Sequence, residues 1–108
     1  MTAVIPPKDE AARWLRGVLE KLGCHVEAEA SKIFPDPPGH EGGRAYTVAF
    51  ILSESHAIIH TAPEHSWIEV IFAFCKEIPL RELVMEARNF FAPRCYAVKK
   101  FDGSPPGV

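Results

Sequence analysis

The pattern of hydrophobic and polar positions differs between segments of the chain, and in two segments it has the spacing of a helix. Over Asp9–Leu22 the apolar residues recur at three-and-four spacing, which predicts an amphipathic helix that stops before Gly23. The same spacing returns over Pro79–Phe91 and predicts a second helix. The apolar positions that carry these predictions are Trp14, Leu15, Val18, Leu19 and Leu22 in the first segment and Leu80, Leu83, Val84 and Ala87 in the second.

The segments outside the two helices are rich in β-branched and aromatic residues, which predicts strands. Pro35–Gly43 contains three prolines and three glycines and predicts a loop, and Ser104–Val108 predicts a frayed tail. The order of elements favours an α+β fold, a two-layer sandwich in which both helices cover one face of a single antiparallel sheet. We expect residues 1–108 to form a single domain. The predicted strands are Cys24–Phe34, Arg44–Leu52, His56–Thr61, Trp67–Cys75 and Tyr96–Phe101.

The predicted strands are apolar on both of their faces. In Arg44–Leu52, Tyr46 and Phe50 fall on one side, whereas Ala49 and Ile51 fall on the other. A sheet with one face in water would alternate apolar with polar residues instead. A core that wraps further around the sheet is one explanation. We favour a second copy packed sheet to sheet, which predicts a homodimer with the two sheets face to face.

Composition and charge exclude several classes of function. The net charge is −2 and the basic residues are scattered, which argues against nucleic acid as a partner. No apolar run approaches the length of about 20 residues that a membrane span requires, and Met1–Pro7 does not resemble a signal peptide. Cys24, Cys75 and Cys95 form no Cys-x-x-Cys pair, which fits free thiols in a reducing compartment. We therefore expect a cytoplasmic protein with no membrane partner.

The stretch from Ser53 to Glu64 combines groups that could cut a peptide bond. The hydroxyl of Ser55 could attack the carbonyl of Glu54 and convert the amide to an ester. A base could then remove the Cα proton of residue 55, and elimination and hydrolysis would leave a pyruvoyl group. His60 has the pKa range of such a base, provided that the chain bends near the Glu54–Ser55 bond to bring the two together.

Two other interpretations of these residues remain open. Ser55 and the histidines could be ordinary polar positions on a solvated strand, and Cys75 a buried apolar residue. The second interpretation is a metal-binding module with four ligands, His56, His60, Glu64 and His65. Their spacing matches no zinc pattern and lacks clustered cysteines, so we expect no metal site.

Leu52–Glu64 resembles the processing motif of the bacterial and archaeal type of S-adenosylmethionine decarboxylase. That family shows Glu-Ser-His-x-x-x-His-Thr-x-Pro-Glu and then a cysteine twenty residues after the serine. The resemblance extends over about Asp9–Phe101. The matching positions here are Glu54-Ser55-His56, His60-Thr61, Pro63-Glu64 and Cys75.

The resemblance implies a proenzyme that cleaves itself between Glu54 and Ser55. Ser55 would become the covalent pyruvoyl cofactor, which forms a Schiff base with the substrate. His60 would assist this processing, and Thr47 would supply a further hydroxyl for it. Cys75 would be the catalytic proton donor.

The resemblance also implies a substrate and a metabolic role. Glu64 would accept hydrogen bonds from the ribose of S-adenosylmethionine, and Phe34 would stack on its adenine. The chain would then be a carboxy-lyase that supplies aminopropyl groups for spermidine synthesis. The flanks depart from the family at Ala62, Ile71 and His65-Ser66-Trp67. An uncleaved regulatory paralogue, or a decarboxylase of ornithine or arginine, therefore stays an alternative.

Overall fold

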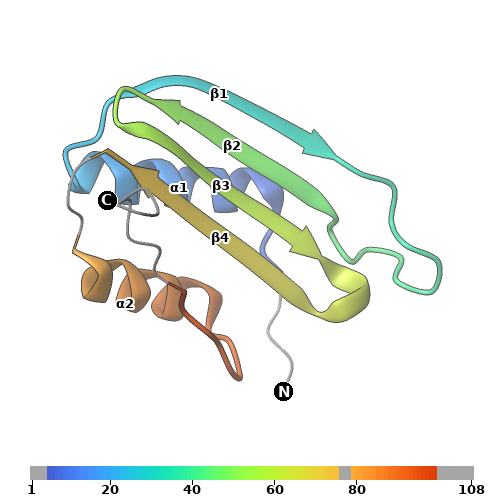
Figure 1. Cartoon of the computed structure of the whole chain (residues 1–108). Helices are drawn as coiled ribbons and strands as arrows, with labels where there is room; N and C mark the ends of the chain where they lie inside the picture. Colours follow the sequence, from blue (N-terminus) through green and yellow to red (C-terminus); the bar gives the residue numbers. More distant parts are fainter. Residues whose placement is uncertain (1–4, 76–78, 100–108) are drawn as a thin grey trace, which may run out of the picture.

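The computed structural model describes residues 5–75 and 79–99 of the chain. Within them two helices flank a run of four strands and one short 3-10 helix (Figure 1). Both predicted helices and the four strands predicted between them are confirmed, with ends that move by one or two residues. The elements are α1 (Lys8–Lys21), β1 (Val26–Ile33), β2 (Tyr46–Leu52), β3 (Ser55–Ala62), η1 (Pro63–His65), β4 (Trp67–Phe74) and α2 (Leu80–Phe91).

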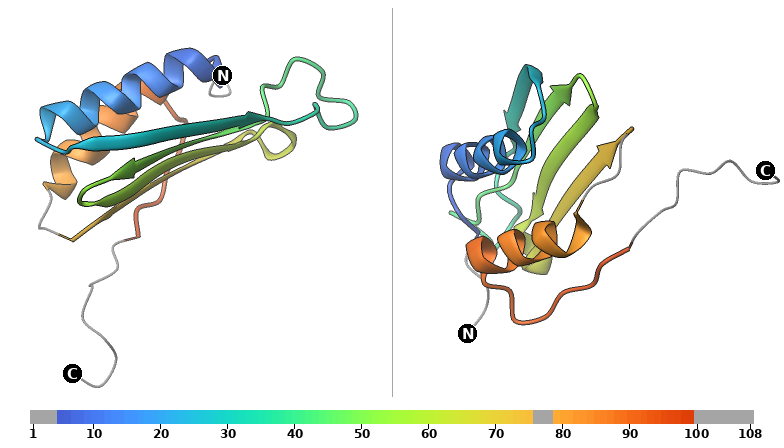
Figure 2. Two further views of the ribbon diagram at one scale, coloured as in Figure 1. Left: turned by 90° about the horizontal axis from the view of Figure 1, so that it is seen from above. Right: turned by 90° about the vertical axis from the view of Figure 1, so that its left-hand side faces the viewer.

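The four strands form one antiparallel sheet in the order β1-β2-β3-β4. Both helices lie on the same face of it, as the two turned views show (Figure 2). Each strand is therefore next to its sequence neighbour, the commonest arrangement of consecutive strands. The predicted α+β two-layer sandwich is confirmed.

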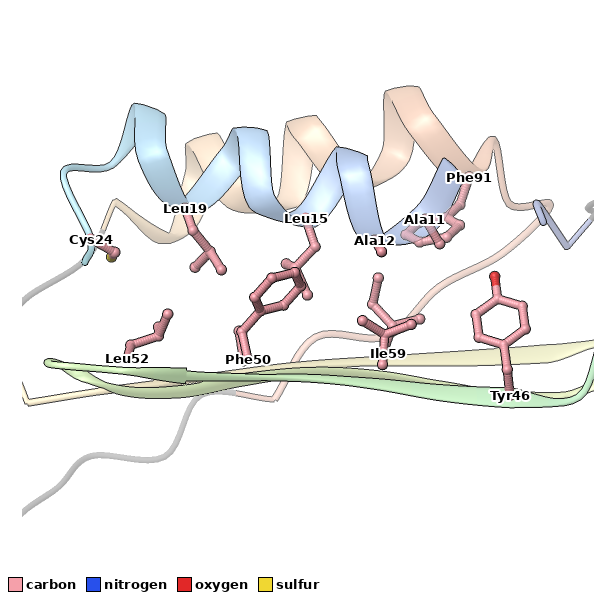
Figure 3. Packing of buried hydrophobic residues seen from close by; sticks show 12 residues of the cluster. Ala11, Ala12, Leu15, Leu19, Cys24, Tyr46, Phe50, Leu52, Ile59 and Phe91 are labelled. Atoms are coloured by element: carbon pink, nitrogen blue, oxygen red, sulfur yellow. The ribbon is translucent and has the colours of Figure 1, made fainter. Parts of the chain in front are cut away.

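The core lies between this helical layer and the sheet. Leu15 and Leu19 of α1 point toward Phe50 and Ile59 of the sheet, and all four are fully buried (Figure 3). Each such side chain contributes about 1.5–3 kcal/mol when it is removed from water. Trp14 of α1 stacks on Phe90 with ring centroids 4.8 Å apart, which joins the two helices.

Two glycines set the path of the chain near the residues that matter for function. Gly23 has φ 78°, a left-handed conformation that ends α1 and turns the chain toward His25 and β1. A Cβ on Gly43 would lie 2.6 Å from the Cβ of Pro63. Only glycine therefore lets the loop before β2 pack against the start of η1, which carries Glu64.

The predicted last strand is wrong in its described part. Tyr96–Lys99 is irregular, whereas Lys100 and Phe101 lie outside the described residues, as does the predicted tail Ser104–Val108. A segment with strand propensity forms a strand only where another strand lies beside it to pair with. The Tyr96 ring lies instead 5.1 Å from the guanidinium of Arg88 in α2, so this segment contacts a helix.

The sheet face opposite the helices is called the open face here. Side chains of this face form rows across the sheet, because residues opposite one another in register share a face. The row at the middle of the strands is entirely apolar. Two isoleucines of the open face, Ile51 and Ile71, are 58% and 37% exposed. In described residues 5–75 and 79–99, no element covers these side chains. The apolar row runs Ala30, Ala49, Ile58 and Ile71 across β1 to β4.

Candidate active site

The Glu54–Ser55 bond lies at the tight turn between β2 and β3. Leu52 and Ser55 are opposite each other in register, so Ser53 and Glu54 form the turn. Ser55 is exposed and has φ 141°, which side chains of L-residues rarely adopt. Such a conformation costs about 1–3 kcal/mol and persists only where neighbouring contacts hold it. The backbone is therefore strained at the bond that the motif marks for cleavage.

The end of β4 supplies one of these contacts. Ser55 is opposite Phe74 in register, and the next backbone amide, that of Cys75, donates a hydrogen bond of 2.8 Å to the carbonyl oxygen of Glu54. An N–H donor on a carbonyl stabilises the negative charge that develops there during nucleophilic attack. The sheet thus brings Cys75 to the Glu54–Ser55 bond although twenty residues separate it from the serine.

The start of β1 holds the same turn from the other side. The backbone amide of His25 donates to one oxygen of the Glu54 carboxylate at 2.9 Å, and its ring Nδ1 lies 2.9 Å from the other oxygen. The His25 ring, and next its amide, lower the pKa of Glu54 to about 2. Sequence reasoning missed His25. The two residues are 29 positions apart, and only the pairing of β1 with β2 brings them together.

The hydroxyl of Ser55 has an imidazole neighbour of its own. Ser55 Oγ lies 3.0 Å from Nδ1 of His56, within the reach of a general base. The sequence had indicated His56 as a position of the family motif and as a possible metal ligand, with no role in cleavage. Successive side chains of a strand normally point to opposite faces, so this contact between neighbouring residues is local to the turn, where Ser55 also has its unusual φ.

A second group of predicted residues lies at the opposite end of β3. Thr47 Oγ1 is 2.7 Å from Nδ1 of His60, and the two residues are opposite each other on β2 and β3. The Phe34 ring meets the His60 ring edge to face, with centroids 6.4 Å apart. Phe34 is 38% exposed, and Glu64 in η1 is exposed as well. This end combines an aromatic face, a hydroxyl, an imidazole and a carboxylate.

The two groups are separated along β3, and we name them the Ser55 end (Ser55, Glu54, Cys75 and His25) and the His60 end (His60, Thr47, Phe34 and Glu64). β3 is continuous from Ser55 to Ala62. Five residues of extended strand span about 16 Å. The bend expected to join Ser55 to His60 is therefore absent, and a single chain does not bring the two together.

The described residues, 5–75 and 79–99, contain no group of three or more His, Cys, Asp or Glu that could hold a metal ion. His56 and His60 are four residues apart on one strand, too far for shared coordination of one ion. The metal-binding alternative has no support in this part of the chain.

The family model for S-adenosylmethionine decarboxylase matches residues 3–103. The chain belongs to this family. The matched range contains the residues of both ends, and membership supports a decarboxylase that acts on S-adenosylmethionine in general terms. No curated protein and no solved structure gives a significant match to the chain. Among the described residues, no helix is long and apolar enough to cross a membrane.

Proposed function

We propose that the chain is a self-cleaving, pyruvoyl-dependent S-adenosylmethionine decarboxylase, a carboxy-lyase whose proenzyme is cut between Glu54 and Ser55. The observation that carries this proposal is the strained φ of 141° at Ser55, next to a Glu54 carbonyl that accepts a hydrogen bond from the Cys75 amide. Strain at the bond and a donor on its carbonyl both favour attack on it. Family membership supports the same reaction class.

The cleavage follows from these groups in balanced steps. Ser55 Oγ attacks the Glu54 carbonyl carbon, its proton passes to a base, and the C–N bond breaks to give an ester and a free amine. A base then removes the Cα proton of residue 55, and elimination releases the Glu54 carboxylate. The remaining enamine tautomerises to an imine. Water hydrolyses it with loss of ammonia, which leaves the pyruvoyl group at residue 55.

Two imidazoles are candidates for the base, and they lie in different places. His56 already contacts the Ser55 hydroxyl, which suits the first proton transfer. His60 is about 16 Å away along β3. A partner subunit could nevertheless bring its own His60 to Ser55. When two open faces pack together, a two-fold axis that lies between the sheets and is perpendicular to the strands makes the two β3 strands antiparallel. The Ser55 end of one chain then faces the His60 end of its partner.

The open face suits such a homodimer. The apolar row Ala30, Ala49, Ile58 and Ile71 lies between the two ends, where the two-fold axis would pass. The exposed Trp67 extends the apolar surface toward the His60 end. Packing two such rows together removes apolar surface from water, and two aligned sheets pack about 10 Å apart. Each dimer would contain two sites, and each site would take residues from both chains.

The roles of the remaining residues follow from this arrangement. Phe34 presents an aromatic face that suits adenine and a sulfonium cation, and the exposed Glu64 carboxylate can accept hydrogen bonds from ribose. The pyruvoyl group supplies an electrophilic carbonyl for the substrate amine and accepts electrons as CO2 leaves. Cys75 would return a proton to the product, a role supported by its backbone amide, which lies at the Glu54–Ser55 bond. Thr47 orients His60 through its hydrogen bond.

The intact mass of the purified chain tests the proposal. We expect the 12.0 kDa chain to separate into Met1–Glu54 and Ser55–Val108, the second with a carbonyl in place of its amino terminus. The second fragment should react with a hydrazide probe and resist Edman sequencing. A chain that stays intact after prolonged incubation would favour the regulatory paralogue instead.

The substrate is tested separately. Release of labelled CO2 should be highest from S-adenosylmethionine when it is measured in parallel with ornithine and arginine. Glu64→Gln should raise the apparent KM for S-adenosylmethionine about tenfold, because the amide accepts ribose hydrogen bonds less strongly than the carboxylate. Higher turnover of ornithine or arginine would reassign the substrate while leaving the cleavage proposal intact.

A further inference from the structure

The turn that contains the Glu54–Ser55 bond is held by two flanking segments. On one side the Cys75 amide binds the Glu54 carbonyl. On the other side His25 makes two hydrogen bonds to the Glu54 carboxylate, and its carbonyl accepts a hydrogen bond of 3.0 Å from the Ser53 amide. These contacts fix both the main chain and the side chain of the residue whose carbonyl Ser55 would attack.

The His25 contacts are charge-assisted and differ from an ordinary surface ion pair. Glu54 is only 12% exposed in its side chain, whereas His25 is 74% exposed. The carboxylate is thus held by the backbone amide and the ring of His25, the residue just before β1, whose own carbonyl is bonded to the Ser53 amide. Hydrogen bonds to an ionised acceptor are stronger and more directional than those between neutral groups. Rotation of Glu54 about its backbone would break both of them.

Such rotation is what would relieve the strain at Ser55. A strained residue keeps its conformation only while its surroundings over-determine it. If Glu54 were free to turn, its carbonyl could leave the Cys75 amide, and Ser55 could relax toward ordinary strand angles. The attack geometry and the donor on the carbonyl would then be lost together.

We propose that His25 is a positioning residue for self-cleavage, which holds Glu54 so that its carbonyl stays on the Cys75 amide and beside the Ser55 hydroxyl. This inference rests on the proposed cleavage at Glu54–Ser55. His25 does not touch the reacting atoms in this geometry. It acts through the Glu54 side chain.

The test compares cleavage rates of freshly purified full-length proenzymes by intact mass. His25→Ala should cleave about 10- to 100-fold more slowly than the wild type, the size of effect expected when reacting groups are misplaced. His25→Asn keeps a side-chain N–H at the position of Nδ1 and should restore the rate to within about threefold. Lys21→Ala is the matched control. It removes the exposed Lys21–Glu86 ion pair of 2.7 Å and should cleave like the wild type.

A double-mutant cycle separates positioning from folding. Because His25 acts through Glu54, His25→Ala combined with Glu54→Ala should be no slower than Glu54→Ala alone. The same substitutions in an uncleavable Ser55→Ala chain should still give a folded protein with a cooperative melting transition, since neither side chain belongs to the hydrophobic core between helices and sheet.

The outcomes separate the two proposals. A wild-type chain that never cleaves overturns the proposed function and the role of His25 together. A wild type that cleaves while His25→Ala cleaves equally fast overturns only the role of His25. The role also fails if His25→Asn is as slow as His25→Ala, or if the two alanine substitutions slow cleavage additively.

Discussion

The two ends of β3 belong to the same hairpin, yet they are held in opposite ways. At the Ser55 end, the backbone is strained, and contacts from the residue before β1 and the residue after β4 fix the turn. At the His60 end, the strand is regular and the functional groups meet as ordinary cross-strand side chains. The apolar row around Ile58 separates them.

The difference indicates that the two ends of β3 have different functions. Strain and fixed carbonyl geometry suit a reaction that the chain performs once upon itself. Exposed aromatic, imidazole and carboxylate groups on a regular strand suit repeated binding of a substrate, as proposed for Phe34, His60 and Glu64. With these proposed roles, a complete site needs one end from each of two chains, and substitutions at each end alone should have separate effects.

The largest expected effect comes from separating the two ends on different chains. Ser55→Ala should abolish cleavage, because no hydroxyl remains to form the ester, and His60→Ala should stall it at or before the ester. Mixing the two variants after unfolding and refolding should restore cleavage. In mixed dimers the intact Ser55 end meets the intact His60 end, so about half of the His60→Ala chains should be cut.

The control for this mixing experiment is Ile58→Lys in both variants, which places charge in the apolar row between the ends. It should prevent dimers, measured by analytical ultracentrifugation, and remove the complementation. Absence of complementation in stable mixed dimers would show that each site is built within one chain.

A second large effect concerns turnover rather than cleavage. Cys75→Ala should lower the rate of CO2 release from processed enzyme about 10²- to 10⁴-fold, because the thiol would be the group that returns the proton. Cleavage should slow much less, since the bond to the Glu54 carbonyl comes from the backbone amide, which alanine retains. Unchanged decarboxylation would make Cys75 a structural residue of the Ser55 end.

A smaller effect is expected from the support of His60. Thr47→Val removes the hydroxyl that lies 2.7 Å from Nδ1 of His60 and should slow cleavage about tenfold, the size of one lost hydrogen bond. Thr47→Ser keeps the hydroxyl and should behave like the wild type. Equal rates for valine and serine would show that the hydroxyl does not orient His60.

The smallest effect is a pH dependence of stability at the Ser55 end. Glu54 has its pKa lowered from 4.5 to about 2 in the folded chain, so its carboxylate stabilises the fold fully above pH 4.5 and loses this contribution as pH falls toward 2. In a Ser55→Ala background, Glu54→Gln should lower the melting temperature above pH 4.5, and the difference should vanish near pH 2. The same comparison in a His25→Ala chain should show a smaller difference. A difference that is constant with pH would contradict this origin.

Much of the fold could be predicted from the sequence because it depends on local periodicity. The apolar spacing in α1 and α2 and the β-branched runs of β2, β3 and β4 are properties of neighbouring residues, and the elements lie where these patterns indicate. Apolar residues on both sides of the strands likewise indicated that the sheet has a second apolar face, and on this face Ile51 and Ile71 are exposed. Tyr96–Lys99 failed to form a strand because propensity alone cannot supply a pairing edge.

The sequence by itself also determined which groups are available for chemistry, since Ser55, His60, Glu64 and Cys75 stand in the register of the family motif. Only the tertiary structure decided how they group. Strand pairing places Cys75 and His25 around the Glu54–Ser55 bond, and an unbroken β3 keeps His60 away from it. Such contacts depend on register between segments 20 to 30 residues apart, and register follows from packing of the whole sheet rather than from local pattern.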